Sequence, residues 1–223
     1  MEKTCLLVLA GAPPSEDLLM WRMEDSDYLI AVDGGFSSFR HADKIPDLLI
    51  GDLDSLTDCD ELENKYPDLE IVRLREQDTT DFEKALNWIF ANIEVKNLIV
   101  LGALGRRTDH LITNLLVASN VDESLNITFD DDEEWIRRVT PSCPLILNGR
   151  KGAVISLLPI QEVTGVMTKG LKWELDGEKI GGKRIIGQSN QCESDSVEIN
   201  CQSGSLFVFL EKENEPKKTS PGK

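Results

Sequence analysis

Short apolar runs that alternate with helical patterns dominate the first half of the sequence. Runs that are apolar without a polar alternation are typical of parallel strands whose two faces are both covered. Strands alternating with helices in this way predict a doubly wound α/β domain with a mostly parallel sheet. The predicted strands are Leu6–Ala10, Tyr28–Val32, Asp47–Ile50, Glu70–Leu74, Leu98–Gly102 and Asn126–Phe129.

Two segments of this half have the spacing of amphipathic helices. The first begins with Thr80 and Glu83, which form a capping-box pattern at its start. Its apolar positions recur with the helical period and predict one buried face. These positions are Phe82, Ala85, Leu86, Ile89, Phe90 and Ile93. A second helix is predicted over Asp109–Ser119, with Leu111, Ile112, Leu115 and Leu116 on its apolar side.

The pattern changes after about residue 137. The stretches PLILNGRKGAVISLLPI, GVMTKGLKWEL and SLFVFLEKE are rich in strand-forming residues, and turn residues separate them. This pattern predicts a small all-β domain, a sandwich. We therefore divide the chain into an α/β domain (1–137), a β-sandwich domain (138–213) and a polar tail (214–223) that we expect to be disordered.

The composition excludes several classes of function. The chain has 24 basic and 40 acidic residues and a formal charge of −16, which disfavours a nucleic-acid partner. No apolar run reaches the roughly 18 residues of a membrane span. Five scattered cysteines without a CxxC pair predict reduced thiols in the cytoplasm and no structural zinc. Two histidines leave little material for a histidine-based metal site or a Ser-His-Asp triad.

Polar motifs follow four of the predicted strands. They are Asp33-Gly34-Gly35, the Asp52-Leu53-Asp54 segment, the loop containing Gln77, Asp78 and Asp81, and the stretch from Gly102 to His110. The carboxyl ends of parallel strands lie at one edge of a sheet, where ligands bind in open α/β folds. We therefore expect the four motifs to converge in space.

Several carboxylates at one edge require a cation. Two like charges about 4 Å apart repel by roughly 4 kcal/mol at an effective dielectric of 20. Oxygen ligands without cysteine or histidine select a hard ion, and Mg²⁺ that also contacts substrate phosphates is the usual case. Asp52 and Asp54 could face one ion from a tight loop, and Asp81 could join them from the start of a helix.

Each of these residues also has a simpler explanation when it is taken alone. Asp81 suits the first turn of a helix, and Asp33, Asp52 and Asp54 suit turns. Arg107 could bind phosphate oxygens or form a surface ion pair. The glycines Gly34, Gly35, Gly102 and Gly105 would let the backbone approach a nucleotide. Neither a Walker A motif nor a GxGxxG motif is present, so ATP binding would depend on a metal and carboxylates.

The ordered set of motifs resembles that of the thiamine pyrophosphokinase family. The motifs are AVDGGFSSF, PDLLIGDLDSL, QDTTDFEKAL and GALGRRTDHLITN, followed by KGLKWEL and GQSN in the second half. The resemblance implies an α/β domain followed by a β-sandwich, and a homodimer. It also implies an Mg²⁺-dependent enzyme that transfers the pyrophosphoryl group of ATP to the hydroxyl of thiamine and leaves AMP.

The resemblance also implies residue roles. Asp52, Asp54 and Asp81 match Mg²⁺ ligands. Asp33, Gly34, Gly35, Thr80, Gly102, Arg107 and Asp109 match the ATP site, and Gln77, Trp173, Ser189 and Asn190 match the thiamine site. Asp78 and Asp109 are alternative acceptors of the hydroxyl proton. Arg106 departs from the family pattern, which more often has glycine there.

Two other classes of function use the same residues. A Mg²⁺-dependent phosphohydrolase or nucleotidyltransferase would need the same carboxylates, and its products would distinguish it. A non-catalytic sensor of a nucleotide or of thiamine diphosphate would bind without turnover. For Trp173, stacking on thiamine and burial in the sandwich core are both open interpretations.

Overall fold

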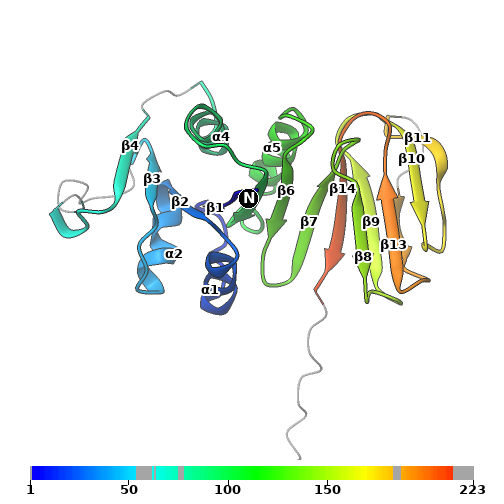
Figure 1. Cartoon of the computed structure of the whole chain (residues 1–223), viewed down its shortest axis with the longest axis horizontal. Helices are drawn as coiled ribbons and strands as arrows, with labels where there is room; N and C mark the ends of the chain where they lie inside the picture. Colours follow the sequence, from blue (N-terminus) through cyan, green and yellow to red (C-terminus); the bar gives the residue numbers. More distant parts are fainter. Residues whose placement is uncertain (1, 54–61, 63, 75–77, 183–186, 213–223) are drawn as a thin grey trace, which may run out of the picture.

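A computed structural model describes residues 2–53, 62, 64–74, 78–182 and 187–212 of the chain (Figure 1). The predicted α/β domain followed by a β-sandwich is confirmed. The predicted tail lies outside the described residues. No helix within the described ranges has the length and apolar character needed to cross a membrane.

Six parallel strands form one part of a ten-stranded sheet. Their order is β4-β3-β2-β1-β5-β6, and all five neighbouring pairs are parallel. The strands are β1 (Thr4–Val8), β2 (Tyr28–Val32), β3 (Leu48–Gly51), β4 (Glu70–Arg73), β5 (Asn97–Leu101) and β6 (Asn126–Asp130). Each predicted strand is present, with ends that differ by at most two residues.

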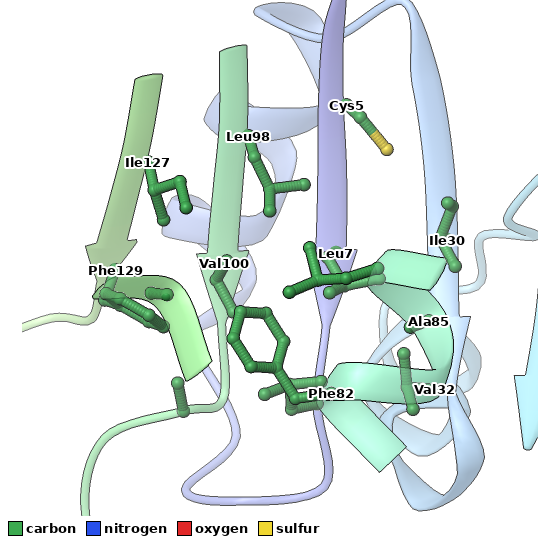
Figure 2. Close-up of a cluster of buried hydrophobic side chains, with 14 of the residues drawn as sticks. Cys5, Leu7, Ile30, Val32, Phe82, Ala85, Leu98, Val100, Ile127 and Phe129 are labelled. Atoms are coloured by element: carbon green, nitrogen blue, oxygen red, sulfur yellow. The ribbon is translucent and has the colours of Figure 1, made fainter. Parts of the chain in front are cut away.

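Helices cover both faces of this part of the sheet. Helices α1 (Glu16–Glu24) and α2 (Phe36–His41) pack on one face with a cluster that includes Leu18 and Phe39. Helices α4 (Asp81–Asn92) and α5 (Thr108–Ser119) pack on the other face. Figure 2 shows Phe82 and Ala85 of α4 against side chains of β1, β2, β5 and β6. Two helical layers around one parallel sheet are the doubly wound arrangement.

The Thr80 half of the capping box predicted for α4 is confirmed, whereas part of the predicted buried faces is wrong. Thr80 Oγ1 accepts a hydrogen bond from the Glu83 amide at 3.2 Å and caps the helix. Phe90, Ile112 and Leu116 were expected in the core, but their side chains are 45%, 55% and 43% exposed. Each lies at the margin of an apolar stripe that is wider than the surface its helix buries. Two exposed apolar residues on α5 therefore face away from this chain.

The large sheet continues into the second half of the chain. Strand β7 pairs antiparallel with β6, and β14, β9 and β12 follow in order. A second sheet, in the order β11-β10-β13-β8, packs against this extension around a separate core. The strands are β7 (Glu134–Val139), β8 (Leu145–Asn148), β9 (Val154–Pro159), β10 (Val163–Lys169), β11 (Asp176–Ile180), β12 (Gly187–Gln191), β13 (Ser196–Asn200) and β14 (Leu206–Glu211). The predicted domain boundary at residues 137 and 138 falls inside β7.

Two buried charges join the halves. Asp130, at the end of β6, is fully buried; its Oδ2 lies 2.6 Å from Arg22 Nη2, and its Oδ1 lies 2.7 Å from Lys212 Nζ. The Arg138 guanidinium of β7 is also buried. It donates to the carbonyls of Ala118, Val121, Asp122 and Leu125, at and beyond the carboxyl end of α5. Both charges thus have close partners, as buried charges require.

The described cysteines fit the prediction of reduced thiols. Cys5, Cys143, Cys192 and Cys201 are buried and unbridged, whereas Cys59 lies outside the described residues. Burial raises the pKa of Cys5 to about 12. Its thiol is therefore protonated and unreactive at neutral pH.

Candidate active site

The chain changes direction across the sheet between β1 and β5. From β1 it continues through β2, β3 and β4 on one side, and then returns to β5 on the other side of β1. Ligands in open α/β sheets bind outside the carboxyl ends of the strands at such a switch point. The predicted motifs after β2, β3 and β5 lie at this edge, beside the Leu9–Pro14 segment that follows β1.

Two adjoining cavities occupy the switch point. The first has a volume of about 770 Å³ and is bordered by Asp33, Gly34, Asp52 and Asp81, together with Ser37 and His41 of α2. The second has a volume of about 580 Å³. It is bordered by Thr79, Thr80, Gly102, Arg107, Asp109 and Asn114. Leu9, Ala10, Gly11, Asp33, Asp81 and Arg106 border both cavities. The convergence predicted for the four motifs is therefore present among the described residues.

Asp33 is the most constrained carboxylate of the site. Its backbone has φ +46°, its side chain is 8% exposed, and Oδ1 accepts a hydrogen bond from the Leu53 amide at 3.0 Å. Burial, and next the charges of Asp81 and Asp52, raise the pKa of Asp33 to about 6, although the Leu53 hydrogen bond opposes the change. A left-handed backbone conformation at a non-glycine residue costs free energy, and such conformations are found most often at functional sites. A cation beside Asp33 would relieve the charge repulsion.

A buried lysine accompanies these carboxylates. Lys84 of α4 is 6% exposed, and its Nζ lies 3.2 Å from Oδ1 of Asp81, whose side chain is 53% exposed. The lysine also favours the ionised form of Asp33. No sequence signal identified Lys84, because its position next to the apolar face of α4 is common for a solvated lysine. The cluster therefore contains one fixed positive charge.

The glycines of the motifs serve the packing of the chain itself. A Cβ on Gly35 would lie 2.0 Å from the Val8 carbonyl oxygen, and one on Gly102 would lie 2.2 Å from the Leu9 carbonyl oxygen. Gly102 also has φ +67°. These glycines let the loops after β2 and β5 close on the segment after β1. We predicted them as nucleotide contacts; the close approach in the structure is to β1 and its following segment, while Gly34 and Gly102 also border the cavities.

Arg107 and Asp109 form an ion pair at the start of α5. Arg107 Nε and Nη2 lie 3.1 and 2.5 Å from the two Asp109 carboxylate oxygens. Hydrogen bonding from Arg107 lowers the pKa of Asp109 to about 2. Both residues are exposed and border the second cavity. Arg107 therefore forms the surface ion pair that was one of its two alternatives, and it also borders a cavity at the edge of the sheet where its motif was predicted to lie.

The loop before α4 is described only in part. Thr79 borders the second cavity, and its Oγ1 is buried without a hydrogen-bond partner among the described residues. Thr80 borders the same cavity, whereas Asp78 is exposed and borders neither. Asp54 and Gln77 lie outside the described residues, so their predicted roles stay predictions. An unpaired buried hydroxyl facing a cavity suits a polar ligand.

The three predicted residues of the β half form their own cluster. Asn190 is 4% exposed; its Oδ1 accepts from the Trp173 amide at 3.1 Å, and its Nδ2 donates to the Trp173 carbonyl at 2.8 Å. The Trp173 side chain is 57% exposed, so the core interpretation is wrong. Ser189 has φ +56°, and its amide donates to Ser156 Oγ at 3.0 Å. Asn190 therefore holds the backbone of Trp173, whose indole is exposed.

This second cluster lies far from the cavities within one chain. Ser189 and Asn190 belong to β12, five strand positions from β5 in the large sheet. At about 4.8 Å for each step this separation is on the order of 24 Å. Trp173, Ser189 and Asn190 are absent from the described lining of both cavities. Within one chain, the described residues predicted to bind ATP thus lie at or beside the cavities, and the residues of the β half predicted to bind thiamine lie in a separate cluster.

Family sequence models match both halves. The model described as "Thiamin pyrophosphokinase, catalytic domain" matches residues 20–129, and "Thiamin pyrophosphokinase, vitamin B1 binding domain" matches residues 144–206. The chain belongs to the thiamine pyrophosphokinase family of enzymes. The two matches lie on either side of the predicted boundary between the domains.

Curated relatives and solved structures agree with this family assignment. Thiamine pyrophosphokinase 1 of rice is 32% identical over 175 residues, which are 74% of this chain and 66% of the rice protein. Thiamin pyrophosphokinase 1 of Caenorhabditis elegans is 27% identical and covers 84% of this chain and 80% of its own length.

The solved structures support the same fold. The crystal structure of thiamine pyrophosphokinase from Bacillus subtilis has a TM-score of 0.76 at 22% identity and covers 95% of this chain and 100% of its own. The yeast thiamin pyrophosphokinase structure has a TM-score of 0.74 at 19% identity, with coverages of 94% and 86%. At these identities the structures show that this family member shares the fold.

The acidic residues of this thiamine pyrophosphokinase family member have the donor chemistry of a hard-metal site. Asp33, Asp52 and Asp81 come from three motifs, border one cavity and offer only oxygen ligands. Within the described ranges, no three acidic, histidine or cysteine side chains are close enough to hold one ion. Asp54, predicted as a further ligand, lies outside those ranges. The donor types therefore fit Mg²⁺ without forming a complete coordination shell.

Proposed function

We propose that this protein transfers the pyrophosphoryl group of ATP to the hydroxyl of thiamine, giving thiamine diphosphate and AMP in an Mg²⁺-dependent reaction. The observation that carries the proposal is the convergence of the acidic motifs on two cavities at the switch point of the sheet. The vitamin-B1-binding-domain match supports thiamine as one substrate, and the catalytic-domain match supports pyrophosphoryl transfer.

The proposed step is an in-line displacement at the β-phosphorus of ATP. The thiamine hydroxyl oxygen forms a bond to this phosphorus, and the bond from phosphorus to the oxygen shared with the α-phosphate breaks. The electron pair leaves with AMP, and the hydroxyl proton passes to a base, for which Asp78 and Asp109 remain alternatives. Positioning and charge neutralisation supply most of the catalysis in such reactions. A strong base is therefore not required.

Asp52 and Asp81, with Asp54, would hold Mg²⁺ in this proposal. The ion would neutralise charge on the phosphoryl oxygens. Asp33 borders the same cavity as Asp52 and Asp81, and burial, followed by the negative charges of these two residues, raises its pKa. Lys84 would hold the Asp81 carboxylate in place through its 3.2 Å contact. The second cavity, with Thr79, Thr80, Arg107 and Asp109 at its border, offers polar groups to the nucleotide.

The proposal includes a homodimer in which the two clusters meet across subunits. Thiamine is much shorter than this separation on the order of 24 Å, so thiamine held at the Trp173 cluster cannot also place its hydroxyl at the cavities of the same chain. A partner copy can place its Trp173 loop over the cavities of the first chain by two-fold symmetry. The exposed Ile112 and Leu116 side chains on α5 are consistent with an apolar contact to such a partner.

Mixing two impaired variants, assayed at a thiamine concentration well below the KM of the Trp173→Ala protein, tests the shared site. Asp81→Asn and Trp173→Ala subunits should recover activity after subunit exchange, because one hybrid site carries both defects and the other carries neither. Recovery should reach about half of the wild-type rate for each mixed dimer. No recovery, with exchange verified by native mass spectrometry, would reject the shared site, and a monomer by light scattering would reject the dimer.

Product identification is the central experiment for the reaction. Purified protein with Mg²⁺, ATP and thiamine should yield AMP and thiamine diphosphate in equal amounts. ADP with thiamine monophosphate would contradict a one-step pyrophosphoryl transfer. Phosphate release independent of thiamine would indicate a hydrolase, and binding without turnover would indicate a sensor.

We also propose that the protein works in the cytoplasm. The support is that four described cysteines are buried and unbridged, as expected where thiols stay reduced. Reporter fusion of the full chain followed by fractionation tests this location. Enrichment in an oxidising compartment would contradict it.

A further inference from the structure

Arg106 occupies the junction of the two cavities at the candidate active site. Its side chain is exposed and borders both cavities, together with Asp33 and Asp81. Neighbouring Arg107 borders only the second cavity. Arg106 therefore lies where a ligand that spans the two cavities must pass.

The two arginines differ in their partners. Arg107 is engaged with Asp109 through two hydrogen bonds of 3.1 and 2.5 Å. Arg106 makes neither a hydrogen bond nor an ion pair with any described residue. Arg106 thus borders the same cavities as Asp33 and Asp81 without pairing to either carboxylate. Its guanidinium donors are available to an anionic ligand.

The backbone at Arg106 is held in a conformation that arginine rarely adopts. Its φ is +55°, in the left-handed region, and the preceding Gly105 has φ +72°. Two further non-glycine residues with positive φ lie close by in the described structure. Asp33 borders the same cavities, and the Leu53 amide donates a hydrogen bond to Asp33. Strain of this kind persists where surrounding structure fixes it, and it gathers at ligand sites.

We infer that Arg106 binds the phosphate chain of the nucleotide at the junction of the two cavities, in addition to any contact from Arg107. This inference rests on the proposed function for the identity of the ligand. A guanidinium presents paired N–H groups that match phosphate oxygens. Because carboxylates line the same junction, an arginine and a metal ion would together offset part of the negative charge of a triphosphate and of these carboxylates.

Nucleotide binding by arginine variants tests this inference without relying on turnover. Calorimetric titration of the full chain with ATP and Mg²⁺ should show that Arg106→Gly raises the Kd for ATP by about tenfold or more, since a charged hydrogen bond has that weight. Glycine suits the left-handed backbone, so the melting temperature should not fall. Arg106→Lys should retain part of the affinity, and the gap between wild type and Arg106→Gly should narrow in high salt.

The control is Arg150→Ala, which removes an arginine from the turn between β8 and β9, outside the lining of both cavities. Its Kd for ATP should stay within twofold of wild type. An Arg106→Gly Kd that also stays within twofold, or an Arg106→Lys Kd as weak as that of Arg106→Gly, would overturn the inference. Tight ATP binding by the wild type without formation of thiamine diphosphate would instead reject the proposed function alone.

Discussion

Buried charge is treated in opposite ways at the candidate active site and at the joint between the two halves. At the joint, Asp130 has Arg22 and Lys212 as partners, and Arg138 has four carbonyl acceptors. At the site, Asp33 is buried beside Asp52 and Asp81, and its pKa is raised to about 6. The joint neutralises its buried charges with partners in the same chain, whereas the candidate active site neutralises its acidic charges only in part.

The difference separates structural from functional charge. A buried charge that only supports the fold needs partners in the same chain, because desolvation is otherwise too costly. A site that binds phosphates and a cation must leave some groups unsatisfied until its ligands arrive. Lys84 supplies one positive charge to the acidic cluster, which limits the cost before binding. Substitutions in the two regions should therefore affect different quantities.

Asp81→Asn should cause the largest effect, and it should appear in catalysis. We expect kcat to fall by at least about a hundredfold, in the range seen when one preorganised electrostatic group is removed. The amide oxygen can still accept from Lys84, so the melting temperature should change little. Steady-state assays over a range of Mg²⁺ concentrations measure the effect. Asp68→Asn, at an exposed position, is the matched control; a wild-type rate for Asp81→Asn at limiting Mg²⁺ would show that the metal assignment is wrong.

Asp130→Asn should have the opposite signature. The change leaves Arg22 and Lys212 without their shared carboxylate, and breaking a buried ion pair from one side costs about 3 kcal/mol or more. Since the two cations are 16% and 23% exposed, they can partly recover hydration, and we expect the lower end of that range. Urea unfolding measures the loss. The comparison fails if kcat falls at a temperature where the variant remains folded.

The sequence predicted the parallel sheet well because its strands are uninterrupted apolar runs. Helix α2 was not predicted, since FSSFRH is only six residues long. Strand β7 was not predicted because its sequence, EWIRRV, is charged; Arg138 is accommodated through carbonyls at and beyond the carboxyl end of α5. Periodicity also placed Phe90, Ile112 and Leu116 in the core, since a helical stripe does not show how far neighbours extend. Propensity is local, whereas these outcomes depend on tertiary contacts.

The part of the candidate site that depends on strand order could be predicted from the sequence. The part that depends on side-chain positions could not. Strand order brings Asp33, Asp52 and Asp81 to one edge whatever their rotamers are. The segment after β1 could have been found by the same rule, because Gly11 also follows a strand of that edge. The contact of Lys84 with Asp81 and the different partners of Arg106 and Arg107 depend on side-chain positions. Spacing in the sequence carries no signal for them.

Asp33→Asn should stabilise the metal-free protein at high pH. Because the pKa is raised from 3.8 to about 6 in the folded state, the folded protein binds this proton more tightly than the unfolded chain. Asp33 therefore lowers stability as pH rises from about 4 to about 6, and the full cost, roughly 2 to 3 kcal/mol, remains above that range. The Asn variant should be more stable by this amount at pH 8 in a chelator.

The difference between Asp33→Asn and wild type should vanish below about pH 3, where the carboxyl is neutral in both states. Unfolding curves of the two proteins at several pH values measure it, and all other titrating groups cancel in the comparison. Adding Mg²⁺ at pH 8 should narrow the gap by favouring the charged wild-type site. A difference that does not depend on pH would show that Asp33 is not held in unfavourable surroundings.

The smallest expected effect concerns the second cluster. Trp173→Ala should raise the KM for thiamine by about tenfold, the order expected for a ring stacked on a cation. Because the indole is 57% exposed, the melting temperature and the KM for ATP should change little. Equal changes in both KM values would argue against a specific thiamine contact.

Asn190→Ala sharpens this last test, because both ends of the Asn190 amide hold the Trp173 backbone. If Asn190 acts only by positioning the indole, its variant should raise the KM for thiamine by a similar factor. It should also lower stability by about 1 to 3 kcal/mol, since backbone groups lose their partner. The double variant should then bind thiamine no worse than Trp173→Ala, as expected for residues that act as one unit. Additive losses would instead show that Asn190 contacts thiamine independently, and the β half would then supply two separate recognition groups.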